Sequence, residues 1–252
     1  MKKILFLLSL LFLCTILSGV IFDRGERKIR TAGRSDTFDK VEIVVPVTNR
    51  VLAFAAAELQ HFLKQGAGIN APVVKAPTGG KLALILGDNA LSRAAGLDVK
   101  KLATEGFFIK RSGNHIFLLG EDDPAADPRK NRWRMWMKRG TLTAVYDFLE
   151  RFASVRFYFP GEMGTVVPRS KGLKLPAVID IIDRPDLVTR ENYSGPKSVW
   201  YEKNDTYMGS LKGYNLSFLR QRYSNQAIPF GHGLAYLDLI GRYSKKHPEY
   251  FA

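Results

Sequence analysis

Apolar positions in the first two thirds of the chain switch between the period of a strand and that of a helix. Residues 41–46 form a short apolar run typical of a strand, whereas apolar positions across 49–63 recur every three or four residues and predict an amphipathic helix. Residues 81–86 are again apolar, and Gly87 follows them, which indicates a buried strand that ends in a turn. This alternation predicts an α/β fold.

The same alternation continues as far as residue 182. Two apolar runs, 107–111 and 115–120, flank a Ser-Gly-Asn turn and predict a hairpin. A second helical pattern covers 140–150, and further extended segments are expected at 155–161 and 175–182. Together these segments predict a small mixed αβ sandwich, with its helices on one face of the sheet.

The pattern changes at Arg184-Pro185, since proline restricts the residue before it and the sequence beyond is rich in Tyr, Gly and Asn. We therefore place one domain at 38–183 and a second region at 185–252. The second region shows no clear run of alternating strands and helices.

The amino-terminal segment, residues 1–22, has the form of a targeting sequence. Two lysines precede an apolar run from Ile4 to Leu17, and Ser18-Gly19 offers a small-residue cleavage site. Apolar residues continue to Phe22, so an uncleaved membrane anchor is the alternative. We expect an exported protein, periplasmic, extracellular or associated with the cell envelope, that meets a membrane only through this segment.

Charge and motif content narrow the chemistry. The chain holds 38 Lys and Arg against 24 Asp and Glu, a net charge of +14, which favours an anionic partner. The single cysteine, Cys14, excludes a disulfide framework and a cysteine-based zinc site. Serine hydrolase and zincin motifs are lacking. The carboxylates at 121–127 are interpreted as a solvated loop rather than a metal site, and no metal or cofactor is expected.

A basic and aromatic stretch precedes the second predicted helix. Arg132, Trp133, Arg134 and Trp136 combine cations with rings, a pattern that suits gripping a uronate while stacking on a sugar. We treat these residues as a candidate anionic-glycan patch. The alternative is an exposed basic insertion whose tryptophans pack locally.

Several segments occur in an order that resembles a known family. They are 56–60 (AAELQ), 84–87 (LILG), 105–109 (EGFFI), 140–150 (GTLTAVYDFLE) and 160–164 (PGEMG). The series resembles the N-terminal domain of α-glucuronidase-like glycoside hydrolases, which is similar to the small αβ domain preceding the barrel in β-hexosaminidases. The tail, 231–233 and 246–252, resembles the start of the barrel region in domain-of-unknown-function family 4838.

The resemblance implies a fold and a set of candidate residues. It implies a (β/α)8 barrel after the small domain, yet the chain stops just after that barrel would begin, so we expect it to be truncated. No position matches the family's catalytic acids, and the catalytic residues stay unknown. Candidate substrate-binding residues in the second region are Arg190, Trp200, His232, His247 and Glu249. The alternative for the last two is a loop whose polar groups satisfy one another.

The resulting hypothesis is an exported carbohydrate-active protein, the N-terminal part of an α-glucuronidase-like glycoside hydrolase of polysaccharide metabolism. Its expected partner is an oligo- or polysaccharide, with or without uronate groups, and not a nucleic acid. Because glycoside hydrolysis needs a pair of carboxyl groups, we expect this chain alone to be inactive. The alternative is a non-catalytic envelope module that binds anionic glycan through a basic surface.

Overall fold

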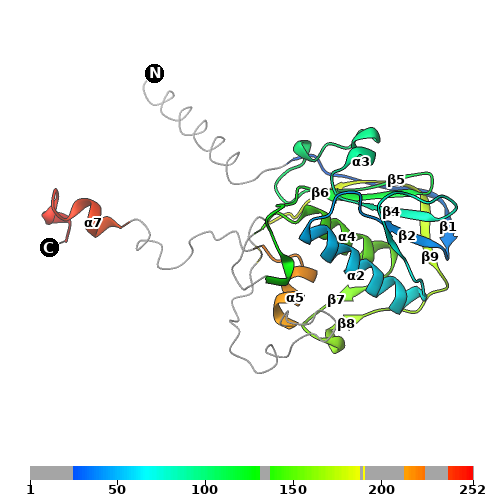
Figure 1. Ribbon diagram of the computed structural model, residues 1–252. Helices are drawn as coiled ribbons and strands as arrows, with labels where there is room; N and C mark the ends of the chain where they lie inside the picture. Colours follow the sequence, from blue (N-terminus) through cyan, green and yellow to red (C-terminus); the bar gives the residue numbers. More distant parts are fainter. Residues whose placement is uncertain (1–24, 131–136, 188–189, 191–212, 225–237, 252) are drawn as a thin grey trace, which may run out of the picture.

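A computed structural model describes residues 25–130, 137–187, 190, 213–224 and 238–251. Its main feature is a seven-stranded sheet with the order β1-β9-β5-β6-β4-β2-β3 (Figure 1). The strands are β1 (Lys28–Phe38), β2 (Val41–Val44), β3 (Val73–Val74), β4 (Leu82–Leu86), β5 (Phe107–Ser112), β6 (His115–Gly120) and β9 (Leu173–Asp183).

The sheet is mixed. Strands β3, β2, β4 and β6 run parallel to one another, whereas β5 pairs antiparallel with both β6 and β9, and β9 pairs antiparallel with β1. The predicted α/β fold with a mixed sheet is therefore confirmed.

Both long helices pack on one face of the sheet, α2 (Arg50–Ala67) and α4 (Gly140–Phe152) (Figure 1). Helix α2 begins where the Asn49 side chain accepts a hydrogen bond from the Leu52 amide at 2.8 Å. It ends at Gly68, whose φ of 68° is the left-handed conformation that glycine adopts without strain. The side chains of the two helices and the inward residues of the strands form the larger apolar core.

The opposite face carries a smaller apolar cluster under α3 (Ala90–Ala94) and the 3-10 turn η1 (Val99–Lys101). Helix α3 begins at Asn89, which forms a reciprocal capping box with Ser92. Because strands alternate their side chains, Val44, Ala83 and Ile85 point to this second layer while their neighbours face the long helices. The sequence pattern had indicated only the layer of long helices.

The remaining elements lie outside the sheet. Two short strands, β7 (Arg156–Phe157) and β8 (Thr165–Val166), form a hairpin around η3 (Glu162–Gly164), and α5 (Gly213–Arg220) lies beside it (Figure 1). The other described elements are η2 (Pro128–Lys130), α7 (Leu239–Tyr243) and η5 (Pro248–Phe251).

The predicted strands, hairpin and helices between 41 and 182 all appear, with shifted ends. Strand β1 was not predicted, and it extends the sheet to residue 28, ahead of the expected domain start at 38. The division at 183/185 stays a prediction. The start of a barrel at 185–252 also stays a prediction, because the described residues there form α5, α7, η5 and one bridge between Arg190 and Ser224.

Two glycines let the end of β6 touch the start of α4. A Cβ atom added at Gly140 would lie 2.7 Å from the Glu121 nitrogen and 2.7 Å from the Gly120 Cα, which are backbone atoms and cannot give way. We expect Gly140→Ala to lower the free energy of unfolding by about 1–3 kcal/mol, measured by urea denaturation. Gly66→Ala in α2 is the control, because its nearest contacts are at 3.3 Å. Equal stability of the two variants would contradict the close approach.

Candidate functional site: an arginine interface on the αβ domain

Three arginines that follow residue 185 in the sequence bind carboxylates of the sheet domain. The pairs, which we call the arginine interface, are Arg220 with Glu58, Arg190 with Glu105, and Arg222 with Glu150. They differ mainly in burial.

The Glu58 carboxylate forms the centre of the most buried pair. Its side chain lies on α2, and no part of it is exposed. Arg220 binds it with two hydrogen bonds, from Nε at 2.9 Å and from Nη2 at 3.1 Å, and the Tyr146 hydroxyl of α4 donates a third at 3.0 Å. The Arg220 guanidinium also lies 5.0 Å and 5.6 Å from the ring centres of Phe62 and Phe157. The buried charge of Glu58 is therefore both paired with a cation and hydrogen-bonded.

Tyr146 is held in its protonated form. Burial raises the pKa of its hydroxyl well above the ordinary value, and the negative charge of Glu58 raises it further. The tyrosine therefore acts as a hydrogen-bond donor to Glu58 and not as a base.

The second pair fixes Arg190 beside Arg139. Arg190 Nη2 donates to both Glu105 oxygens, at 2.9 Å and 3.0 Å, and Nε donates to the Arg222 carbonyl at 2.8 Å. Arg139 at the start of α4 donates to the Tyr223 carbonyl, and burial lowers the pKa of its guanidinium. Backbone and side-chain contacts thus join residues 190 and 222–224 to the sheet domain.

The third pair lies closer to solvent. Arg222 Nη2 is 2.6 Å from a Glu150 oxygen, and the two side chains are 26% and 23% exposed. Solvent screening weakens a pair in such a position compared with the Glu58 pair.

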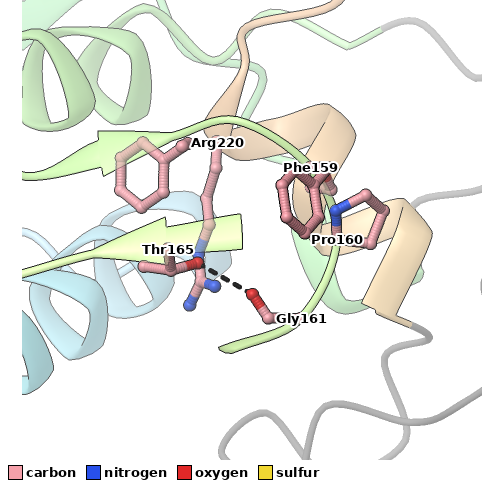
Figure 2. A pocket seen from close by; sticks show the side chains of 7 residues that line it. Phe159, Pro160, Gly161, Thr165 and Arg220 are labelled. Atoms are coloured by element: carbon pink, nitrogen blue, oxygen red, sulfur yellow. Dashed lines mark hydrogen bonds between the residues drawn. The ribbon is translucent and has the colours of Figure 1, made fainter. Parts of the chain in front are cut away.

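A hollow beside Arg220 lies between the β7–β8 hairpin and α5 (Figure 2). Figure 2 shows Phe159, Pro160 and Gly161 around one side of it, with the Thr165 hydroxyl donating to the Gly161 carbonyl at 3.1 Å. No water-sized sphere fits inside it. It is therefore a packing gap and not a substrate site.

A more open hollow lies between α2 and the β3 edge of the sheet, with a volume of about 250 Å³. Its polar groups are already engaged: the Gln60 amide donates to the Ala71 carbonyl at 2.8 Å, and the Lys75 ammonium donates to the Thr48 hydroxyl. The rest of its lining is valine and alanine, and none of its lining residues is a carboxylate. It offers no carboxyl group for hydrolysis.

The Asp122 carboxyl group has a strongly raised pKa. Its Oδ1 accepts from the Thr141 amide at 3.0 Å, at the start of α4. Burial raises its pKa from 3.8 to about 7, partly offset by the Thr141 hydrogen bonds and aided by the adjacent Glu121 charge. Asp122 therefore titrates near neutrality and holds the helix start.

The other carboxylates of 121–127 also have partners. Lys138 lies 2.6 Å from Glu121, Asp123 accepts from the Ala125 amide at 2.9 Å, and Asp127 accepts from the Arg129 amide at 3.1 Å. Among the described residues no group of three or more His, Cys, Asp or Glu side chains is placed to hold a metal ion.

The predicted site residues are only partly described. Arg190 is in the arginine interface, its donors directed at Glu105 and at backbone carbonyls. His247 Nδ1 lies 3.1 Å from Glu249 Oε1, and the His247 ring stacks on Tyr250 with centres 4.7 Å apart. The residues that lie outside the described part are Arg132, Trp133, Arg134, Trp136, Trp200 and His232. The binding roles of all of these residues stay predictions.

Sequence reasoning missed Glu58, Tyr146 and Arg220. One signal was present: Glu58 lies three residues after Ala55 and four before Phe62, on the apolar face of its helix. An acidic residue in that position needs a buried cationic partner. Nothing in the local sequence showed which arginine supplies it.

No family model and no curated protein matches the sequence. Solved structures that the chain is similar to include enzymes of family GH20. A β-N-acetylhexosaminidase of family GH20 from Streptomyces coelicolor matches at 11% identity and a TM-score of 0.38, over 63% of this chain and 25% of that one. A family GH20 exo-β-N-acetylglucosaminidase from Vibrio harveyi matches at 16% and 0.36, over 65% and 19%.

The chain spans about a quarter or less of the length of these enzymes. A likeness of this size assigns no activity, and the resemblance to α-glucuronidase-like proteins and to family 4838 stays a prediction. Among the described residues, no helix has both the length and the apolar character needed to cross a bilayer.

Proposed function

We propose that this chain belongs to an exported carbohydrate-active protein, in which the sheet domain is a non-catalytic support for the region that follows residue 185. The observation that carries this proposal is the arginine interface. In it, Arg190, Arg220 and Arg222 bind three separate carboxylates of the sheet domain. Such a fixed junction is what a support domain needs to hold a neighbouring region in one orientation.

The hollows among the described residues favour a supporting role over a catalytic one. Hydrolysis of a glycoside usually uses two carboxyl groups about 5–9.5 Å apart on either side of the sugar. Neither described hollow is lined by any Asp or Glu. The proposal therefore places any catalytic acids outside these two hollows.

The carbohydrate assignment rests on the ordered segments that resemble the α-glucuronidase-type domain. The net charge of +14 favours a sugar that carries uronate groups. An envelope module that binds anionic polymer by charge alone is the competing function.

Activity and binding assays on the purified chain test the proposal. We expect no release of nitrophenol from aryl N-acetyl-β-glucosaminides or aryl glucuronides, and retardation in native gels cast with a uronate-bearing polysaccharide but not with its neutral counterpart. Turnover that persists after further purification would contradict the non-catalytic role. Retardation by any polyanion, lost steeply with added salt, would favour the competing function because screened charge is then the main term.

A further inference from the structure

One surface of the sheet has a strong excess of cations. It lies at the β1 edge, on the side of the sheet away from α2 and α4. We call it the basic sheet surface, and its charged residues are Lys28 and Arg30 on β1, Lys110 on β5, and Lys174 and Asp180 on β9.

The strand register places these side chains on one side. Asp180 pairs with Arg30 on one neighbouring strand and with Lys110 on the other, and directly paired residues point to the same face. The Lys28 ammonium bonds the Asp180 carboxylate, which puts it on that face as well. On β9, Lys174 shares the parity of Asp180, opposite to the buried Leu173 and Leu175 that face the helices.

The charges on this surface do not cancel. Four cations stand against the single carboxylate of Asp180, so its net charge is +3. In the strands on the other side of β5, which are β6, β4, β2 and β3, the only acidic residue is Glu42 on β2. It is fully buried and hydrogen-bonded to Thr78. The surface therefore presents a positive field to any flat anionic partner.

The surface lacks the features of a sugar site. Sugar recognition uses an exposed aromatic ring for stacking together with convergent polar groups. The aromatic residues on this side of β5 and β6, Phe108 and Phe117, are only 8% and 4% exposed and pack under the second layer. A flat cationic surface without a ring platform matches a charged layer better than a sugar chain.

In the sequence, this surface begins shortly after the apolar amino-terminal segment, residues 1–22. Five residues separate Phe22, at the end of the apolar amino-terminal segment, from Lys28 at the start of β1. Even a fully extended link of that length spans only about 20 Å. While that segment is in a bilayer, β1 is held within this distance of the headgroups.

We propose that the basic sheet surface binds the anionic headgroups of a lipid bilayer. The inference shares with the proposed function only the amino-terminal segment that would direct export, and it does not depend on any sugar. It replaces the expectation that the protein meets a membrane through this segment alone. Each Lys or Arg near an anionic leaflet contributes about 1 kcal/mol of attraction. The surface would thus orient the sheet domain on the membrane, with the β1 edge toward the lipid.

Vesicle sedimentation of the full chain tests this. The readout is the ratio of binding to vesicles with one quarter phosphatidylglycerol over binding to pure phosphatidylcholine, so that insertion of the apolar segment contributes to both terms. In the variant Arg30→Gln, Lys110→Gln, Lys174→Gln we expect the ratio to fall at least tenfold. Lys28 is left in place because it neutralises Asp180.

The control variant, Lys64→Gln, Lys130→Gln, Arg169→Gln, removes the same charge from exposed positions elsewhere. We expect its ratio to change less than twofold. Equal losses in the two variants would overturn the proposal, since net charge alone would then explain binding. An unchanged vesicle ratio with lost binding to polygalacturonate would also overturn it and would identify an anionic polysaccharide as the partner. Both outcomes are independent of the aryl glycoside and neutral-polysaccharide assays, so this proposal and the proposed function can fail separately.

Discussion

Replacing Arg220 by methionine is expected to lower the free energy of unfolding by about 3–5 kcal/mol, because it leaves the Glu58 carboxylate buried without its cation. Tyr146 still donates one hydrogen bond, but it carries no charge to offset that of Glu58. The loss cannot exceed the free energy needed to release α5 from the sheet domain and let water reach Glu58. Urea denaturation measures the change in unfolding free energy, and limited proteolysis of residues 190–224 detects the release of α5.

Two further variants make this result specific. Arg222→Met removes the outer pair, whose members are 26% and 23% exposed, and is expected to cost about 1 kcal/mol or less. In the double variant Glu58→Gln, Arg220→Met no charge of this pair remains buried. Its loss of unfolding free energy should therefore be well below the sum of the losses in the two single variants. Additive losses, or equal effects of Arg220→Met and Arg222→Met, would show that the Glu58 pair is not the main fastening.

The variant Asp122→Asn is expected to gain stability over the parent protein when the pH is raised from 4.5 to 8. Folding raises the pKa of the Asp122 carboxyl from 3.8 to about 7. Between pH 4 and pH 7 the carboxyl therefore keeps its proton in the folded protein and has lost it in the unfolded chain. This contribution to stability is present below pH 4 and disappears as the pH rises through 7. The variant has no such dependence, and its amide oxygen still accepts from Thr141.

The difference in unfolding free energy between Asp122→Asn and the parent should therefore rise by roughly 2–4 kcal/mol from pH 4.5 to pH 8. Urea denaturation at several pH values measures it. Glu121→Gln provides an independent check, because removing the adjacent negative charge lowers the pKa of Asp122 and narrows the pH window. A difference that stays constant with pH would rule out a raised pKa at Asp122.

The sequence pattern located the inner strands of the sheet and missed both edge strands, β1 and β3. Strands β2, β4, β5 and β6 are apolar because they lie between layers, so their residues alone indicate strands. Strand β1 is an edge strand with an almost wholly exposed burial pattern, and it carries Lys28, Arg30 and Arg34. Its conformation depends on pairing with β9, which no local pattern reveals.

The arginine interface was beyond sequence reasoning for a similar reason. Arg220 and Glu58 are 162 positions apart, and neither was a candidate site residue in the sequence. Arg190 is a substrate-binding candidate in the sequence, and its contacts here are with Glu105 and backbone carbonyls. Charge attraction is insensitive to spacing along the chain, so only the fold brings such partners together.

The pairing of β1 with β9 also sets the order in which the domain is completed during synthesis. Lys28 pairs with Ile182, so the first strand to leave the ribosome has no partner until the last strand of the sheet has been made. A contact of such sequence separation forms late. A chain interrupted before residue 173 would expose an open edge on β5 as well as on β1, and edges of this kind promote aggregation.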